Sequence, residues 1–413
     1  VLHVRLTNHL QQATNVHFHG LEVSPLDHGD NSMHLVLPGE TWDYEIPIPA
    51  THPPGVYWYH THGHQYAERQ LMGGLSGTLV IEGFQDEVPA TKPLTEQILV
   101  IKDFTPDKSG NLQAVPKPFN FTMRTINGQL QPRLDMQPGE TQLWRFTNQT
   151  ANGYLRLALE GHQITVIGRD SHPILRPQSV DEVFIGPAER LDVLVTAKSA
   201  GSFRLVAEET TTGPAGDTFP AQDLALLAAA PNAALPPPAP LGPLTIAASK
   251  TSTPIRGDAI NAERSITFSS DPVTGLFFIN HAAFDHTRVD VLVPLGSIEE
   301  WTLRNAADEL HTFHIHQITF QVLSVNGKDV PFEGRVDTVD IPIHGEVKIR
   351  LDFTDPIIVG RFMFHCHILE HEDKGMMQQI EVYDPRVGPM PESAMDMNGM
   401  DHTLHMPALA TGE

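Results

Sequence analysis

Cysteine, basic residues and long apolar runs are all scarce in this chain. Its 413 residues include one cysteine, so no disulfide can form within the chain. Lys and Arg total 27 against 50 Asp and Glu, a formal charge of −23, and no basic run occurs. No stretch has the roughly 18 apolar residues that a membrane-spanning helix needs. These absences argue against a nucleic-acid partner, an anionic membrane surface and a membrane span.

Long helical periodicity is missing as well. Short alternating runs rich in Val, Ile, Thr and aromatics, separated by Pro and Gly turns, predict an all-β chain. The length suits two or three domains, each with its own core. The alternation begins at Val1 itself, so we expect further residues upstream and a signal peptide lost with them.

A short motif occurs three times. Val4 to Asn8 reads V-R-L-T-N, Trp144 to Asn148 reads W-R-F-T-N, and Trp301 to Asn305 reads W-T-L-R-N. Nine and eleven residues after the closing asparagine, the first and third copies carry histidine and the middle copy carries leucine. These residues are His17 and His19, His314 and His316, and Leu157 and Leu159. The sequence therefore predicts three similar units with metal chemistry in the outer two.

A second pair of offsets, counted from a glycine, gives the same pattern. Five and seven residues after a glycine, the outer copies again carry histidine, whereas the middle copy carries Val206 and Glu208. The histidines are His60 and His62 after Gly55, and His365 and His367 after Gly360.

Composition shifts give the predicted domain limits. Residues 83–93 form a polar, Pro-containing connector, and residues 228–243 read as a Pro-rich linker that cannot form regular strands. The domains are predicted at 1–84, 85–235 and 244–385, followed by a tail at 386–413.

Strand geometry gives the histidine pairs a common orientation. Alternate side chains share a face, so each His-x-His pair presents two imidazoles on one side, about 6.6 Å apart. In His365-Cys366-His367, the thiol must then face away from its two neighbours. A thiolate behind the strand and two imidazoles in front could join two metal centres.

The residues after Cys366 complete a familiar ligand set. His371 and Met376 lie five and ten residues on, and a Cys with two His and a distant Met is the ligand set of blue copper. His311 is the best candidate for the second imidazole. Met377 is the alternative to Met376, because Met also fills irregular core gaps.

Eight histidines remain, enough for three coppers in sets of two, three and three. They are His17, His19, His60, His62, His314, His316, His365 and His367. A structural zinc site would favour Cys ligands, which are nearly absent.

Together these four segments resemble the multicopper oxidase family, specifically the three-domain members that include laccases and bacterial cuprous oxidases. The resemblance covers essentially the whole chain and implies three cupredoxin-like Greek-key domains and four copper ions. It implies type 1 ligands His311, Cys366, His371 and Met376, type 2 ligands His17 and His314, and type 3 ligands His19, His60, His62, His316, His365 and His367. The family's usual N-terminal strands are absent, so the first domain is expected to be incomplete.

Oxygen reduction consumes protons, so a carboxylate should lie near the three coppers. Glu372 is the first candidate and Asp30 the second, and the resemblance implies an acidic residue in each neighbourhood. The alternative for both is an ordinary solvated acid.

The tail carries several methionines and two histidines. Thioethers select Cu(I), so the tail could collect copper; a disordered end with coincidental methionines is the alternative. These residues are Met390, Met395, Met397, Met400, His402, His405 and Met406.

The expected activity is laccase-like: single electrons pass from phenols or aromatic amines to dioxygen, which is reduced to water. We expect electrons to enter at an exposed edge of His311 or His371 and to pass through Cys366 to His365 and His367. A metallo-oxidase of Cu(I) or Fe(II) is the main alternative; a copper nitrite reductase and an electron-transfer or copper-storage protein explain the eight histidines less well. The resemblance implies a periplasmic or secreted location.

Overall fold

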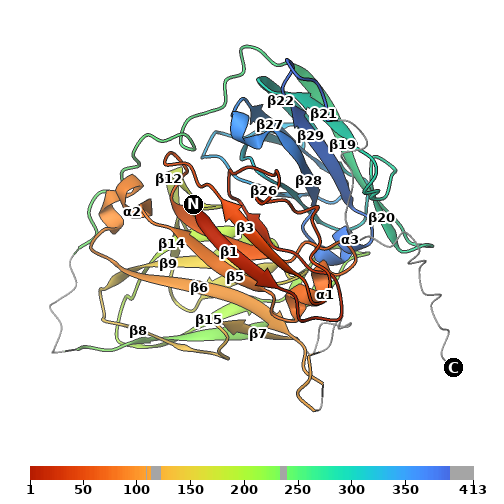
Figure 1. The fold of residues 1–413 in the computed structure, drawn as a ribbon. Coiled ribbons are helices and arrows are strands. Elements are labelled where there is room, and N and C mark those ends of the chain that lie inside the picture. The colour runs from red at the N-terminus through yellow and green to blue at the C-terminus, as the bar shows by residue number, and fades with distance from the viewer. Residues whose placement is uncertain (108, 113–121, 233–239, 391–413) are drawn as a thin grey trace.

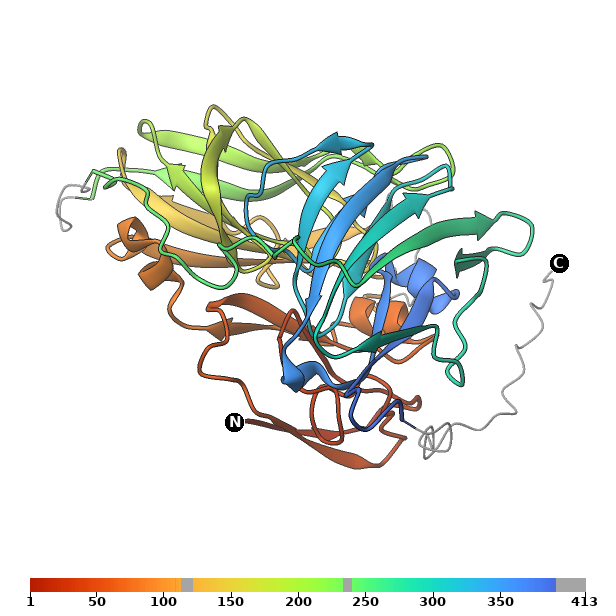
Figure 2. The same cartoon turned by 90° about the horizontal axis from the view of Figure 1, so that it is seen from above.

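Three groups of β-strands follow one another along the chain. The computed structural model describes residues 1–107, 109–112, 122–232 and 240–390. Figures 1 and 2 show red-to-orange, yellow-to-green and teal-to-blue strands gathered in three regions, with only short helices. This arrangement confirms the prediction of an all-β chain built from three successive units.

The first unit contains two small sheets. One pairs β1 (Leu2–Thr7) with β3 (Thr41–Ile46), and the other holds β2 (His17–His19), β4 (Gly55–His60) and β5 (Ser76–Ile81) in the order β2-β4-β5. Alternate side chains point inward, and Phe18, Tyr44 and Tyr57 form the centre of a buried core.

The middle unit has a five-stranded and a six-stranded sheet. The five-stranded sheet has the order β13-β10-β15-β18-β8, with bounds Glu182–Ile185, Leu155–Leu159, Gly201–Glu208, Gln222–Ala229 and Arg133–Met136. The six-stranded sheet has the order β12-β11-β14-β9-β6-β7, with bounds His172–Val180, Ile164–Arg169, Arg190–Thr196, Thr141–Asn148, Thr95–Phe104 and Met123–Ile126. A separate pair joins β16 (Thr210–Thr211) to β17 (Thr218–Phe219).

The third unit repeats this topology strand for strand. Its five-stranded sheet has the order β26-β23-β28-β29-β21, with bounds Thr338–Ile341, His311–Ile315, Gly360–Cys366, Met377–Tyr383 and Val291–Pro294. Its six-stranded sheet has the order β25-β24-β27-β22-β19-β20, with bounds Lys328–Asp329, Phe320–Val325, Glu346–Phe353, Ser297–Asn305, Ala262–Asp271 and Leu276–Ile279. The Trp144 and Trp301 strands, β9 and β22, each pair in parallel with the first strand of their own unit, which accounts for the sequence repeat.

The helices described are all short. They are α1 (Ala67–Met72), α2 (Phe84–Glu87), α3 (Leu369–Asp373) and the 3₁₀ turns Pro89–Thr91 and Pro356–Ile358. Helix α1 of the first unit lies beside α3 of the third (Figure 1), and a buried cluster there also includes Ala151 and Ala188 of the middle unit. The three units thus share buried contacts.

Two predicted connectors differ from the structure. The linker prediction is wrong at Ala228 and Ala229, because both end strand β18 and are buried against the ladder of β15 and β8. The segment at 83–93 contains α2 and a 3₁₀ turn, and its Phe84 and Val88 are buried in a core with residues of the middle unit. Apolar burial by these few side chains outweighs the polar, Pro-containing composition.

We retain 1–84, 85–235 and 244–385 as proposed domain limits. The tail from 386 is described only as far as Met390, whose backbone bonds to Arg361 and Glu381 of the third unit. The other tail methionines and both histidines lie outside the described residues.

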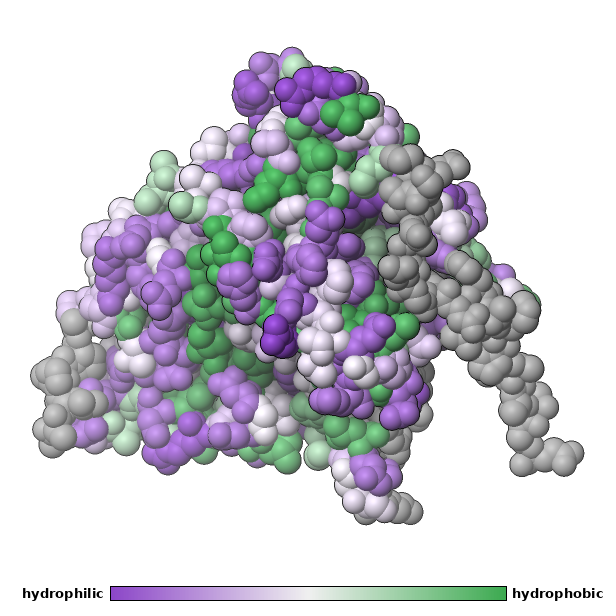
Figure 3. All heavy atoms as spheres, viewed as in Figure 1, coloured by the Kyte–Doolittle hydropathy of each residue, from purple (hydrophilic) through white to green (hydrophobic). Residues whose placement is uncertain are grey.

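Among the helices described, none is long and apolar enough to cross a membrane. The face in Figure 3 is largely hydrophilic, with apolar side chains in smaller groups.

Candidate copper centres

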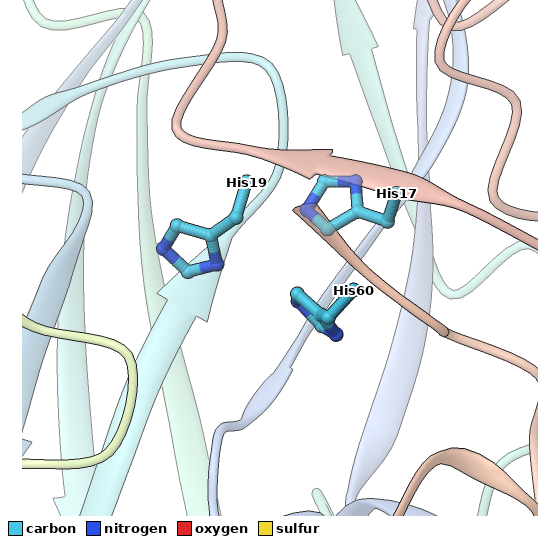
Figure 4. Close-up of side chains that lie close together, drawn as sticks. All are labelled: His17, His19 and His60. Carbon is cyan, nitrogen blue, oxygen red and sulfur yellow. The ribbon is translucent and has the colours of Figure 1, made fainter. Parts of the chain in front are cut away.

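Neighbouring strands bring the histidines of the first unit together. His17 of β2 pairs with His60 of β4, and their ring centroids are 5.4 Å apart. His19, two residues along β2, lies 5.9 Å from both rings. Figure 4 shows the three imidazoles pointing toward a common space between the strands. The expected sharing of one face by His-x-His residues is therefore present at β2.

The third unit supplies a matching set. His314 of β23 pairs with His365 of β28, as His17 pairs with His60 in the first unit. The two sets meet face to face. The ring of His17 stacks on that of His316 with centroids 3.7 Å apart, and the ring of His19 stacks on that of His314 with centroids 3.8 Å apart. All eight predicted histidines lie in this one buried cluster between the first and third units, which we call the shared cluster.

Three of these rings converge on a single point. The Nε2 atoms of His62, His316 and His365 lie 3.1 to 3.2 Å from one another. Burial lowers the pKa of His62 to about 3 and the pKa of His316 well below its usual value, so these rings are neutral and present lone pairs. Neutral imidazoles facing each other in this way are suited to a metal ion between them.

In several rings of the shared cluster, the outer nitrogen, which faces away from the cluster, is hydrogen-bonded. The inner nitrogen, which faces into the cluster, is then available to bind a metal. Nδ1 of His60 lies 2.8 Å from the Thr61 carbonyl, and Nδ1 of His314 lies 2.8 Å from the Asp337 carbonyl, which fixes the tautomer of each ring. Several inner nitrogens are buried without any hydrogen-bond partner, an arrangement that is costly unless a metal completes it. They are Nε2 of His17, His60, His314 and His367, and Nδ1 of His19. The residues present therefore fit bound copper.

A second cluster lies within the third unit, behind strand β28. Cys366 Sγ is 3.7 Å from Nδ1 of His311 and 3.7 Å from Nδ1 of His371, and these two nitrogens are 3.2 Å apart. Met376 is fully buried, and its carbonyl accepts from the Cys366 backbone amide at 3.0 Å. We call these four residues the thiol cluster: the structure brings the side chains of His311, Cys366 and His371 together and places Met376 beside Cys366 through its backbone.

The thiol and imidazoles of this cluster are held out of water. Burial raises the pKa of the Cys366 thiol and lowers the pKa of His311 to about 3. A coordinating metal would deprotonate the thiol outright. The expected exposed edge is absent at His311, which is 0% exposed, and His371 is also buried, at 3% exposed, where its ring stacks on Phe277.

Both predicted acids are buried beside the shared cluster. Asp30 Oδ2 lies 3.0 Å from His17 Nδ1 and accepts from Gln317 Nε2 at 2.7 Å; burial raises the pKa of Asp30, but His17 and these hydrogen bonds lower it overall. Glu372 lies 3.1 Å from His365 Nδ1. Burial opposes its ionisation, but His62 and His365 lower its pKa to about 2. Neither acid is an ordinary solvated side chain.

Sequence reasoning missed the residues behind His19. Its Nε2 lies 3.2 Å from Asp337 of the third unit, which is paired with Arg190 of the middle unit. One signal was available: Gly20 follows His19 at φ +83°, and a Cβ there would lie 2.7 Å from the Asp337 carboxylate. A glycine directly after a ligand motif indicates a close approach by another segment.

Known proteins resemble this chain over nearly its whole length. Three family models described as multicopper oxidase match residues 1–86, 55–228 and 251–386. A multicopper oxidase of Staphylococcus haemolyticus is 28% identical over 400 residues, covering 92% of this chain and 79% of the relative. The cell division protein FtsP of Escherichia coli is 27% identical over 398 residues, covering 91% and 80%.

Solved structures agree in fold. A multicopper oxidase from Campylobacter jejuni, described as a metallo-oxidase, has a TM-score of 0.79 and 29% identity, covering 93% of this chain and 83% of its own. A laccase-like multicopper oxidase from Ochrobactrum has a TM-score of 0.76 and 26% identity, covering 92% and 88%. These matches confirm the expected cupredoxin-like fold of the three units.

Proposed function

The chain belongs to the multicopper oxidase family, and from that premise we propose that it is a laccase-like enzyme that couples oxidation of phenols or aromatic amines to reduction of dioxygen. Members of this family bind copper and use dioxygen with a reducing substrate. The finer proposal is one type 1, one type 2 and a type 3 pair of coppers. When bound, four coppers would together supply the four electrons that take dioxygen to water.

One observation carries the proposal: adjacent residues of one strand face the two clusters. Cys366 Sγ lies 3.7 Å from His311 and His371, while Nε2 of His365, the preceding residue, lies 3.1 Å from His62 in the shared cluster. Covalent bonds of Cys366 with His365 and His367 therefore join the clusters. We assign electron conduction between the clusters to these three residues.

The donor atoms of each cluster suit the type of copper that we propose for it. Thiolate, two imidazoles and a buried Met favour a copper that accepts single electrons. We propose His311, Cys366, His371 and Met376 as type 1 ligands and His17 and His314 as type 2 ligands. The type 3 ligands would be His19, His60, His62, His316, His365 and His367.

We propose proton delivery for Glu372 and Asp30. Neither Glu372 oxygen has hydrogen-bond geometry to a partner, although the carboxylate is fully buried against two ligands. A buried acceptor left open in this way is typical of functional positions. Asp30 holds His17 from behind and would serve the opposite side of the shared cluster.

Electrons would enter at His371, whose ring is the more exposed of the two imidazoles in the thiol cluster. A metallo-oxidase of Cu(I) or Fe(II) is the second candidate. Glu309 Oε1 lies 3.5 Å from His371 Nε2 and would place negative charge where a metal cation gives up its electron. The similarity to a metallo-oxidase from Campylobacter jejuni points the same way. The proposed location remains periplasmic or secreted, as the family resemblance implies.

Oxygen uptake by copper-loaded protein tests the proposal. We expect an oxygen electrode to record uptake with a methoxyphenol, and a higher rate on that substrate than on Cu(I) would support the laccase-like assignment. A reversed ratio would favour the metallo-oxidase. No uptake with either substrate by protein holding four coppers would overturn the oxidase proposal and favour an electron carrier.

A further inference from the structure

The middle unit, which lacks ligand histidines, reaches the shared cluster through Arg190. This residue begins strand β14, and its side chain is 2% exposed. Its Nη1 donates to Asp337 Oδ1 at 2.8 Å and its Nη2 donates to Asp337 Oδ2, a two-point pairing with a carboxylate of the third unit. The pair is sealed from solvent, since the Asp337 side chain is 0% exposed.

Asp337 in turn holds one ligand from each outer unit. Its Oδ1 accepts from His19 Nε2 at 3.2 Å, and its backbone carbonyl accepts from His314 Nδ1 at 2.8 Å. For His19 this bond turns Nδ1 toward the cluster, whereas His314 presents Nε2. One residue therefore sets the tautomer of two stacked rings.

Asp337 also lies close enough to His19 and His314 to be considered a metal ligand itself. Its carboxylate is already engaged, because Arg190 binds both oxygens and Thr338 Oγ1 donates to Oδ1 at 2.8 Å. A carboxylate neutralised by a guanidinium is a poor donor to a cation. Its geometry is that of an acceptor which orients the histidines.

The middle unit also binds the backbone of this segment through Asp170. Its Oδ2 accepts from the backbone amides of Asp337 at 3.3 Å and Thr338 at 3.2 Å, while its Oδ1 accepts from the Arg190 amide at 3.1 Å. A Cβ on Gly20 would lie 2.8 Å from Arg190 Nη2, so the first unit also packs directly against the guanidinium. The contact leaves little room for an alternative arrangement.

We propose that Arg190 is a positioning residue for the three-copper site: through Asp337 it fixes His19 and His314, and so gives the middle unit a direct role in oxygen chemistry. The inference rests on the proposed function of the shared cluster. It predicts that loss of the two-point pairing weakens copper retention there and leaves the thiol cluster intact.

Replacement of Arg190 by Lys tests this inference, since the charge stays and the planar fork is lost. We expect copper-loaded Arg190→Lys to keep its blue absorption but to retain type 2 and type 3 copper about tenfold more weakly against a chelator. The type 2 EPR signal and the type 3 absorption should change as well. Arg145→Lys is the matched control. Arg145 is equally buried in the same unit and donates to Asp192 at 2.6 Å, but none of the contacts described for it involves a histidine of the shared cluster.

The inference is overturned if Arg190→Lys matches Arg145→Lys in copper retention, type 2 EPR and type 3 absorption. If Arg190→Lys yields no blue protein, Asp337→Asn decides in its place by the same measurements. If both variants load copper, the double variant should lose no more than the worse single variant, because Arg190 acts through Asp337. Wild-type protein lacking type 2 and type 3 copper signals would instead refute the proposed function itself.

Discussion

The two clusters differ in how they are assembled. The thiol cluster draws its four residues from a single unit, and strands β23 and β28 of one sheet carry His311 and Cys366. The shared cluster needs the first and third units to dock, since its rings stack in pairs across the interface. A local site depends on one domain fold, whereas the other depends on the arrangement of the whole chain.

The two clusters come closest along the chain at strand β28, where the adjacent residues His365 and Cys366 face different clusters. Substitutions on opposite faces of this strand should therefore give separable defects. The expected effects range from complete loss of activity to a modest shift in colour.

Replacement of Cys366 by Ser should abolish the blue colour and reduce oxygen uptake to background. The hydroxyl is a poor substitute for thiolate at a blue site and interrupts the proposed conduction path. Type 2 EPR and type 3 absorption should remain, with one copper fewer per chain by metal analysis. A blue, active variant would contradict the proposed path.

Replacement of His316 by Ala should produce the opposite pattern. This change removes one of three converging Nε2 atoms, so the shared cluster should lose copper while the blue absorption persists. Oxygen uptake should fall by about 100-fold or more. His344→Ala is the control, because that histidine is exposed and pairs only with Asp308 among the contacts described. Equal copper content in the two variants would argue against His316 as a ligand.

Replacement of Glu372 by Gln should slow turnover by about 100-fold and alter its pH profile, with all four coppers retained. The change removes a buried carboxylate 3.1 Å from His365 without altering its shape. Glu370→Gln is the matched control on the same helix, where Glu370 pairs with Lys374 at 2.6 Å. An unchanged rate and pH profile for Glu372→Gln would remove this acid from proton delivery.

Replacement of Met376 by Leu should have the smallest effect. The fold should be retained because Leu fills a similar buried volume, and only the proposed weak ligand of the thiol cluster is lost. The blue band and the reduction potential should shift, while oxygen uptake changes by less than about tenfold. If Met377→Leu shifts the band and Met376→Leu does not, Met377 is the axial ligand.

Much of this arrangement could be predicted from sequence because it follows strand periodicity. The offsets from Asn8 and Asn305 place the histidines on equivalent strands, and the opposed faces at Cys366 follow from alternation alone. Leu157 and Leu159 sit at the same offsets in the middle unit and are buried in its core, as the missing ligands suggested.

What could not be predicted depends on contacts between distant segments. Arg190 and Asp337 are 147 residues apart, and neither belongs to a recognisable motif. The strand at Ala228 and Ala229 was missed because burial against β15 and β8 outweighs a composition rich in Ala and Pro. The burial of His311 was missed because exposure depends on how neighbouring segments pack over a residue.

The near-complete burial of the eight histidines has a consequence for maturation. Each of these residues is at most 2% exposed, so an ion arriving from solvent meets packed side chains before it meets most of the ligand nitrogens. We expect metal loading either to depend on local opening between the outer units or to precede their docking, so its speed should follow the frequency of such opening. Conditions that loosen the interface without unfolding the chain should hasten metallation, and the same conditions should hasten metal loss.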